Sequence, residues 1–230
     1  RLGFTEKDLP ELLSKLNSRP ELRVSSVFSH LAGSDENAFD KYTKTQWKLF
    51  KLYTRQMSRA LPYRFERHIL NSAGIERFPQ WQCDRVRLGI GLYGVSVCSP
   101  EALQPVASLK TRILQIHEFK KGESIGYSRT VLLDRDSRIA TLPVGYGDGF
   151  NRHHTGGDVL VNGQRAKILG NICMDLCMVD VTDIAAHEGD TVVLFGKGLP
   201  LTELAERLST ISYEVLTSVS ERVKRVYFKE

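Results

Sequence analysis

The hydrophobic periodicity of this 230-residue chain changes near residue 100. Before that point, short apolar segments alternate with segments whose apolar residues recur every three or four positions, which is typical of strands alternating with helices. From Ala107 onward the period is mostly two and turn residues interrupt it, which is typical of antiparallel strands. The sequence therefore predicts an α/β fold with parallel strands over residues 1–103 and a mostly antiparallel β domain over residues 104–230.

In the first part, Thr5 and Asp8 have the spacing of a capping box, and a helix is expected from there to about Ser18. A longer helix is expected over residues 38–60, and strands are expected over 22–28, 67–72 and 85–93. Such alternation implies parallel strands joined by right-handed crossovers.

Three polar residues, His30, Ser72 and Arg87, lie at or near the carboxyl ends of these expected strands. In βα-barrels this edge of the sheet carries the active site. One histidine in such a place is more often a structural residue, but three polar residues on one edge indicate a site.

In the second part, Asn162-Gly163 between two alternating runs predicts a β-hairpin over residues 159–168 with a type I′ turn. Further strands are expected over 178–181, 191–195 and 222–228. A helix is expected near residues 202–208, with Thr202 as its cap.

Two glycine-rich corners, Gly126-Tyr127 and Gly145-Tyr146-Gly147, each place a tyrosine on a bend from which it can project out of the sheet. Taken alone, these corners are better explained as ordinary turns with half-buried tyrosines.

The composition excludes several classes of protein. The net charge is +5, but Lys and Arg are scattered among 27 acidic residues, which argues against nucleic-acid binding. No apolar run is long enough to span a membrane. The four cysteines, Cys83, Cys98, Cys173 and Cys177, have neither zinc-like spacing nor the density of a disulfide framework. We therefore expect no metal site and a reducing compartment, the cytoplasm.

Short motifs spread over the whole chain carry a family resemblance. They are Arg1-Leu2-Gly3-Phe4, Ser29-His30-Leu31-Ala32, Asn71-Ser72-Ala73, Arg87-Leu88-Gly89-Ile90, Gly126-Tyr127, Gly145-Tyr146-Gly147-Asp148-Gly149, Gly170-Asn171-Ile172-Cys173-Met174-Asp175 and Ile211-Ser212-Tyr213-Glu214-Val215. With these motifs in this order, the chain resembles the bacterial alanine racemases, the fold-type III pyridoxal-phosphate enzymes.

The resemblance implies the C-terminal part of a (β/α)8 barrel that binds pyridoxal 5′-phosphate (PLP), followed by a β domain. It also implies a head-to-tail homodimer with shared active sites. The implied reaction is the interconversion of L-alanine and D-alanine by two bases, which supplies D-alanine for peptidoglycan.

The resemblance also implies roles for individual residues. Tyr127 would be the acid/base on the L-alanine side in the partner's site, and His30 would hydrogen-bond near Tyr127 and Arg87. Arg87 would face the pyridine nitrogen of PLP. The phosphate would be held by Ser72, by the backbone of Gly89 and Ile90, and by Tyr213.

On the substrate side, Arg1 and the backbone of Met174 would bind the carboxylate, and Tyr146 and Tyr213 would narrow the access passage. An isolated phenol with a pKa near 10 is a poor base at neutral pH. A neighbouring network of His and Arg is what such a base would need, because positive charge favours the phenolate.

One feature of the family has no match. Its Schiff-base lysine lies upstream of every motif found here. We therefore expect this chain to be the C-terminal portion of such an enzyme, and we expect these 230 residues alone to be inactive.

Two alternatives stay open. The chain could be a non-catalytic module for dimerisation or scaffolding, which would form a stable dimer without binding PLP. It could also belong to a broad-spectrum amino-acid racemase, which would turn over bulky amino acids as fast as alanine.

Overall fold

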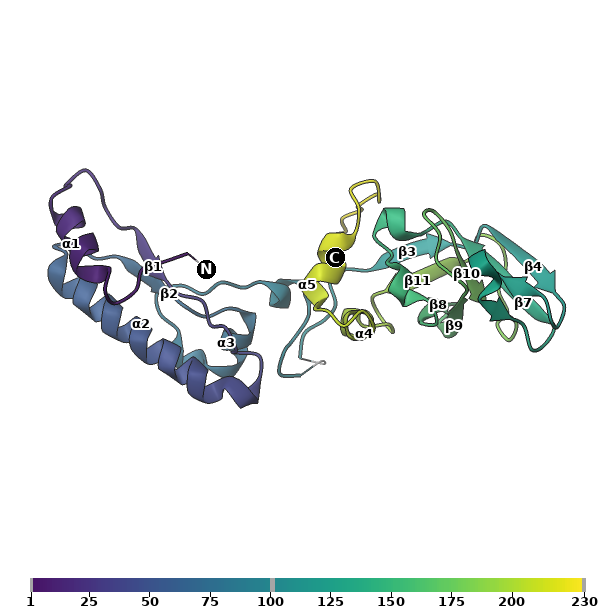
Figure 1. The fold of residues 1–230 in the computed structure, drawn as a ribbon, viewed down its shortest axis with the longest axis horizontal. Coiled ribbons are helices and arrows are strands. Elements are labelled where there is room, and N and C mark those ends of the chain that lie inside the picture. Colours follow the sequence, from purple (N-terminus) through teal and green to yellow (C-terminus); the bar gives the residue numbers. More distant parts are fainter. Residues whose placement is uncertain (1, 100–101, 229–230) are drawn as a thin grey trace. The chain divides into compact units, whose positions relative to one another are not determined.

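The computed structural model describes residues 2–99 and 102–228, and the chain divides into two compact units, residues 1–104 and 105–230. In Figure 1 the colours run from purple to teal through the first unit and from teal to yellow through the second. Within the described ranges, no helix is both long enough and apolar enough to cross a membrane.

The first unit is built on a short parallel sheet. Strand β1 (Ser26–Phe28) pairs with β2 (Glu66–His68), so that Phe28 lies opposite His68. Helices precede, connect and follow the strands: α1 (Leu9–Asn17), η1 (Asn37–Phe39), α2 (Asp40–Ala60), α3 (Ser72–Arg77), η2 (Pro79–Trp81) and η3 (Ile90–Tyr93). The parallel pairing across the long helix α2 is the βαβ arrangement expected from the sequence.

Two apolar clusters hold these elements together. One joins Phe50 of α2 to Leu31, Ile69 and Leu70 behind the sheet, and it includes Trp81. Trp81 stacks on Phe78 with ring centroids 4.2 Å apart. The other cluster packs α1 on α2 through apolar residues of both helices and the segment that follows α2: Leu9, Met57, Leu61 and Phe65. Burial of one face of α2 therefore fixes the strands behind it.

Helix α1 begins at Leu9, so the expected start directly after Thr5 is wrong. Pro10 stands in the first turn of the observed helix, where its missing N–H costs nothing. In a helix that started at Glu6, the Pro10 ring would clash with the carbonyl four residues before it. Thr5 instead donates its N–H (2.6 Å) and its hydroxyl (2.7 Å) to the Asp8 carboxylate.

The expected strand over residues 85–93 is also wrong, and so is the assignment of Ser72 to a strand end. Ser72 is the first residue of α3. The N–H groups of Gly89 (2.9 Å) and Gly91 (3.2 Å) donate to the Ser72 hydroxyl oxygen instead of to a neighbouring strand. Because this segment uses its donors on a side chain, it turns into the 3-10 helix η3 at Ile90.

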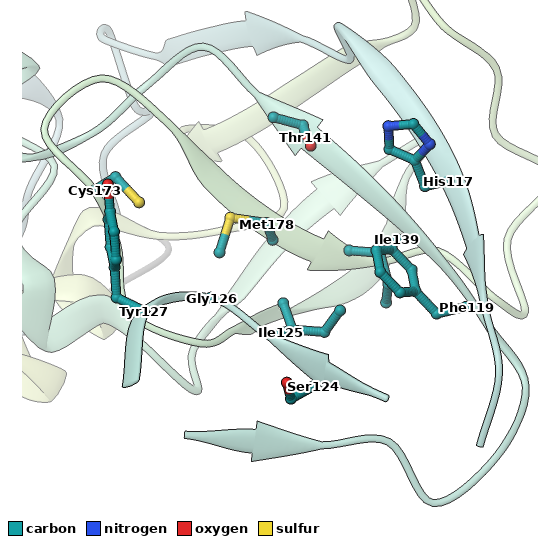
Figure 2. A pocket seen from close by; sticks show the side chains of 10 residues that line it. All are labelled: His117, Phe119, Ser124, Ile125, Gly126, Tyr127, Ile139, Thr141, Cys173 and Met178. Atoms are coloured by element: carbon teal, nitrogen blue, oxygen red, sulfur yellow. The ribbon is translucent and has the colours of Figure 1, made fainter. Parts of the chain in front are cut away.

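The second unit is a seven-stranded antiparallel sheet with the strand order β3-β11-β8-β9-β10-β7-β4. Its strands are β3 (Leu109–Arg112), β4 (Gln115–Phe119), β7 (Ser137–Leu142), β8 (Asp158–Val161), β9 (Gln164–Leu169), β10 (Cys177–Asp180) and β11 (Thr191–Phe195). A separate hairpin is formed by β5 (Ser124–Ile125) and β6 (Val131–Leu132). Ile125 of this hairpin packs with Ile139 of β7 and with Phe119 of β4 (Figure 2).

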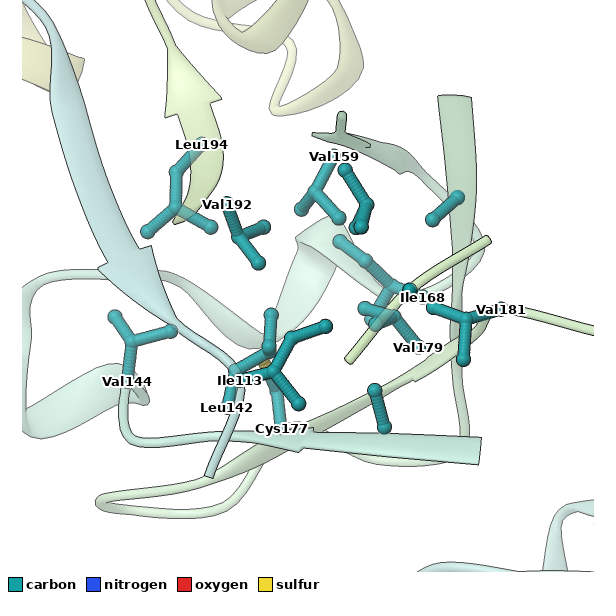
Figure 3. Packing of buried hydrophobic residues seen from close by; sticks show 14 of the residues in the cluster. Ile113, Leu142, Val144, Val159, Ile168, Cys177, Val179, Val181, Val192 and Leu194 are labelled. Atoms are coloured by element: carbon teal, nitrogen blue, oxygen red, sulfur yellow. The ribbon is translucent and has the colours of Figure 1, made fainter. Parts of the chain in front are cut away.

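The alternation of apolar side chains along these strands produces one large core (Figure 3). Leu142, Val159, Val179 and Val192 come from four different strands, and each is fully buried. The β8–β9 hairpin confirms the expected type I′ turn, since Asn162 (φ 50°) and Gly163 (φ 78°) both have positive φ.

Helices and short 3-10 turns complete the second unit: η4 (Tyr127–Arg129), η5 (Tyr146–Asp148), η6 (Arg152–His154), α4 (Leu201–Arg207) and α5 (Ser212–Ser218). The N-cap of α4 is Pro200 and not Thr202, which lies inside the helix. Helix α5 was not expected from the sequence. The expected strand over 222–228 is wrong, because the Val223 N–H donates to the Ser220 carbonyl (3.1 Å) and closes a turn. The Arg225 guanidinium donates to the carbonyls of Val219, Ser220 and Val223 around this turn.

Substituting Gly149 should destabilise the second unit much more than substituting Gly163. Both glycines have positive φ, 92° and 78°. An added Cβ at Gly163 meets no atom within 4 Å, whereas at Gly149 it would lie 2.0 Å from the Ser218 carbonyl oxygen. We expect Gly163→Ala to cost about 1 kcal/mol for the backbone conformation alone, and Gly149→Ala roughly 3 kcal/mol or more because of the added clash.

The measurement is the free energy of unfolding from hydrogen exchange of the buried β7 and β10 amides. Equal losses in the two variants would contradict the close contact between the 146–149 corner and the end of α5.

Candidate active site

The side chain of Arg87 lies across the carboxyl ends of β1 and β2. Its Nη2 group donates to the Ser29 carbonyl (2.7 Å) and lies 3.3 Å from His30 Nδ1. Its Nη1 group lies 2.7 Å from His68 Nδ1 and donates to the His68 carbonyl (3.3 Å). The guanidinium also sits over the Phe28 ring at 5.2 Å. These contacts bring Arg87 and His30 together, as the sequence led us to expect for this pair.

His68 is the residue of this cluster that the sequence analysis missed. Its ring stacks on Phe28 with centroids 5.3 Å apart. Since a guanidinium only donates, His68 Nδ1 must accept, which requires the neutral ring with its proton on Nε2. Burial lowers the pKa of His68, and the positive charges of Arg87 and Arg85 lower it further. One signal was present in the sequence: in a parallel sheet, a histidine ending β2 lies beside the chain that leads to His30.

Ser72 organises the neighbouring loop. Its oxygen accepts hydrogen bonds from Gly89 and Gly91, and the side chain is buried. The preceding residue, Asn71, caps α3 by accepting from the Gly74 N–H (2.9 Å). A hydroxyl oxygen that accepts twice keeps its own hydrogen as a donor. Ser72 and the backbone from Gly89 to Ile90 thus lie within one small region next to Arg87.

In the second unit, Tyr127 stands on the corner between β5 and β6 and is 71% exposed. Gly126 (φ 78°) makes the bend, and an added Cβ there would lie 3.3 Å from the Asn171 nitrogen. The Asn171 side chain donates to the Tyr127 carbonyl at 3.1 Å. The corner is therefore braced against the 170–171 loop, and the phenol is left outside.

Tyr127 borders a cavity of about 420 Å³ whose other walls are mostly apolar (Figure 2). Cys173 and Met178 line it beside the tyrosine, and His117 and Phe119 line it on β4. The cavity lies on the side of the Tyr127 corner that faces β10 and β4. Burial raises the pKa of the deeper Cys177 thiol to about 12, so this cysteine behaves as a core residue.

The second corner, which carries Tyr146, is joined to the Met174 loop. The Tyr146 N–H donates to the Cys173 carbonyl (3.0 Å), and the Gly147 N–H donates to the Met174 carbonyl (2.9 Å). An added Cβ at Gly145 would lie 2.2 Å from the Cys173 oxygen, so only glycine allows this approach. Tyr146 and Met174 are both about half exposed, 46% and 54%.

The remaining candidates are placed as follows. Tyr213 lies in the first turn of α5 and is 44% exposed. Arg1 lies outside the described residues. His30, Ser72, Arg87, Gly89 and Ile90 belong to the first unit, and Tyr127, Tyr146, Met174 and Tyr213 belong to the second. The expected contact between His30 and the Tyr127 of a partner subunit stays a prediction.

Among the residues that the structure describes, no group of three or more His, Cys, Asp or Glu side chains could hold a metal ion. All four cysteines are free thiols. The candidate residues that the structure describes lie in the Arg87 cluster, the Ser72 loop, the two tyrosine corners and α5.

Comparison with known proteins assigns both units to one family. Residues 1–97 match the family described as "Alanine racemase, N-terminal domain", and residues 106–227 match "Alanine racemase, C-terminal domain". The chain belongs to the alanine racemase family. An alanine racemase from Clostridium tetani is 40% identical over 245 residues, which cover 100% of this chain and 62% of that protein.

Solved alanine racemases have the same fold. The biosynthetic alanine racemase of Pseudomonas aeruginosa superposes with a TM-score of 0.87 at 35% identity, covering 100% of this chain and 64% of that one. The alanine racemase of Bartonella henselae, solved with covalently bound pyridoxal phosphate, gives 0.87 at 32% identity, covering 99% and 63%. The chain thus spans less than two thirds of the length of these relatives. The likeness confirms part of a TIM-like barrel followed by an antiparallel β domain.

Arg87→Lys should destabilise the first unit more than Arg85→Lys. Lysine presents one point charge and cannot reach Ser29, His30 and His68 together. We expect a loss of about 1–3 kcal/mol, the cost of buried acceptors left without a donor. The Arg85 side chain only pairs with Glu66 at the surface, so Arg85→Lys should lower the free energy of unfolding by less than about 0.5 kcal/mol. Both tryptophans, Trp47 and Trp81, lie in the first unit, so urea unfolding followed by tryptophan fluorescence measures it.

The same measurement across pH tests the tautomer of His68. Its pKa is lowered from 6.5 in the folded chain, so the unfolded chain takes up this proton first as the pH falls. The stability from the Arg87–His68 bond is therefore present above pH 6.5 and is lost as the pH falls through the lower folded-state pKa. An advantage of Arg87 over lysine that grows on acidification would contradict an accepting His68.

Proposed function

We propose that residues 1–230 form the C-terminal part of a PLP-dependent racemase that interconverts L-alanine and D-alanine. The main support for the proposal is the position of the Arg87 guanidinium. It is held at the strand ends between His30 and His68, next to the Ser72 loop. Family membership supports the reaction, because relatives at about 40% identity over the whole chain are alanine racemases.

The donor set of the first unit fits PLP. The Ser72 hydroxyl and the backbone of Gly89 and Ile90 would hold the phosphate, since hydroxyl and amide donors suit an anion of this shape. Tyr213 of the second unit would add a further hydroxyl donor. Arg87 would face the pyridine nitrogen. When bound, PLP supplies the electron sink that makes the α-proton of alanine acidic. The Bartonella henselae structure, which contains covalently bound pyridoxal phosphate, supports this assignment.

Arg87 limits how strongly the cofactor withdraws electrons. Burial lowers the pKa of Arg87, but a guanidinium remains protonated at neutral pH. Facing Arg87, the pyridine nitrogen would stay unprotonated, which weakens the sink and favours simple return of the proton over side reactions. Neutral His68 keeps the guanidinium in place without giving it a negative charge to compensate.

Tyr127 would remove and return the α-proton on the L-alanine side, in the site of a partner subunit. Its exposure on a braced corner suits a residue that completes a second copy's site, and a head-to-tail homodimer follows from this role. Near His30 and Arg87, a phenolate would be favoured by positive charge and hydrogen bonding.

Arg1 and the Met174 backbone would bind the carboxylate of alanine, and Tyr146 and Tyr213 would narrow the passage to it. The narrow passage is the reason to prefer alanine over the broad-spectrum alternative. With its free thiols, the protein suits the cytoplasm, where it would supply D-alanine for peptidoglycan. No residue of this chain matches the Schiff-base lysine, so we propose that these 230 residues on their own do not racemise alanine.

The first test compares PLP binding by Ser72→Ala and Ser96→Ala in the gene product that contains this chain. Losing one hydroxyl bond to the phosphate should weaken PLP binding roughly ten- to hundredfold, as a hydrogen bond to a charged group requires. Ser96 is also buried, but its hydroxyl bonds to Glu76 (2.6 Å), so its loss should change PLP affinity little. A stable dimer that binds no PLP would instead favour the scaffold alternative.

Tyr127→Phe should separate the two proton transfers. Overall racemisation must fall equally in both directions, since the equilibrium is unchanged, and we expect a loss of at least about a hundredfold. Loss of α-deuterium to solvent should stop for L-alanine and persist for D-alanine, because only the L-side base is missing. If Tyr127→Phe loses α-deuterium equally from both enantiomers, Tyr127 is not the base on the L-alanine side. Turnover of a bulky amino acid as fast as alanine would favour the broad-spectrum alternative.

A further inference from the structure

Two loops of the second unit, residues 145–149 and 173–176, are joined by one side chain from the C-terminal segment. Arg222 donates through Nε to Asp148 Oδ1 (2.8 Å) and through Nη2 to Asp175 Oδ1 (2.8 Å). Asp148 belongs to the Tyr146 corner, and Asp175 directly follows Met174. The guanidinium therefore connects the two loops that carry proposed substrate-side residues.

The bridge is closely fitted on the Asp148 side. An added Cβ at Gly147 would lie 2.5 Å from Arg222 Nη2, so the guanidinium rests against the backbone of the corner. Asp148 also accepts the Gly145 N–H (2.9 Å), and its side chain is only 17% exposed. The backbone of the C-terminal segment is held at the same point, since the Ser220 N–H donates to the Asp148 carbonyl (3.0 Å).

The charges at this point bear on an anionic substrate. Asp148 and Asp175 place one negative charge on each of the two loops that Arg222 joins, and Arg222 cancels one of these two charges. Removing Arg222 would change the charge of the cluster from −1 to −2. A carboxylate approaching the Met174 amide would then be repelled more strongly, by an amount that dissolved salt screens.

We propose that Arg222 is a positioning residue for the substrate carboxylate. It acts through two other groups: it keeps the Met174 loop against the Tyr146 corner, and it offsets the charges of Asp148 and of Asp175, the residue that follows Met174. The inference rests on the proposed function, in which that amide binds the carboxylate of alanine. Arginine suits the task because its planar fork serves two carboxylates at once, which a lysine cannot do.

The experiment measures KM and kcat for L-alanine and D-alanine in the gene product that contains this chain, for Arg222→Gln, Arg222→Lys and the control Arg225→Gln. We expect Arg222→Gln to raise KM about three- to tenfold with a smaller change in kcat, the range for loss of a charge-assisted contact. The increase should shrink at high salt, and Arg222→Lys should restore part of it. Arg225 lies on the same segment but donates only to backbone carbonyls, so its loss should leave KM unchanged.

An unchanged KM in Arg222→Gln, or an equal rise in Arg225→Gln, would overturn the proposal. If the unsubstituted gene product does not racemise alanine, the proposed function is wrong, and this result does not depend on Arg222. Hydrogen exchange then decides the role of Arg222: the Gly147 amide, which donates to Met174, should exchange faster in Arg222→Gln than in Arg225→Gln. Equal exchange in the two variants would show that Arg222 does not hold the loops together.

Discussion

A guanidinium at the end of a two-stranded parallel sheet is costly unless its N–H groups find acceptors. Arg87 meets this need by donating to carbonyl groups at the ends of β1 and β2, and it also contacts one nitrogen from each of two histidines. The path of residues 85–91 follows from this arrangement. With Arg87 anchored, the next amides reach the Ser72 hydroxyl, and the chain turns into η3.

Local signals in the sequence were enough for part of the fold. Asn162-Gly163 predicts its own turn, because both residues tolerate positive φ, and the hairpin around it is found. The parallel pairing of β1 and β2 and the change to an antiparallel sheet follow from periodicity that is visible along the chain. In these cases the interactions that decide the structure lie within a few residues or repeat regularly.

The errors occur where a side chain takes the place of a backbone hydrogen-bond partner. Residues 85–93 have the composition of a strand, but the Ser72 hydroxyl takes the N–H groups of Gly89 and Gly91. The segment after Ser220 alternates like a strand, but the Arg225 guanidinium donates to the carbonyls of Val219, Ser220 and Val223. His68 was overlooked for a similar reason, since only the strand register places it against Arg87. No local pattern reports such contacts.

Arg87 and Arg222 differ in whether a carboxylate neutralises their positive charge. Arg222 lies between two carboxylates, so its charge is spent on neutralising them. In the part of the chain that the structure describes, Arg87 contacts three carbonyl oxygens and two imidazole nitrogens, and none of these groups carries a negative charge. Its positive charge is held in place but not cancelled. A half-buried cation kept only for stability would gain more from a carboxylate partner. Acceptors without negative charge instead leave the positive charge of Arg87 uncompensated at the strand ends. This charge adds to burial in lowering the pKa of His68. It would also favour a phenolate or an electron-rich ring nitrogen placed next to Arg87.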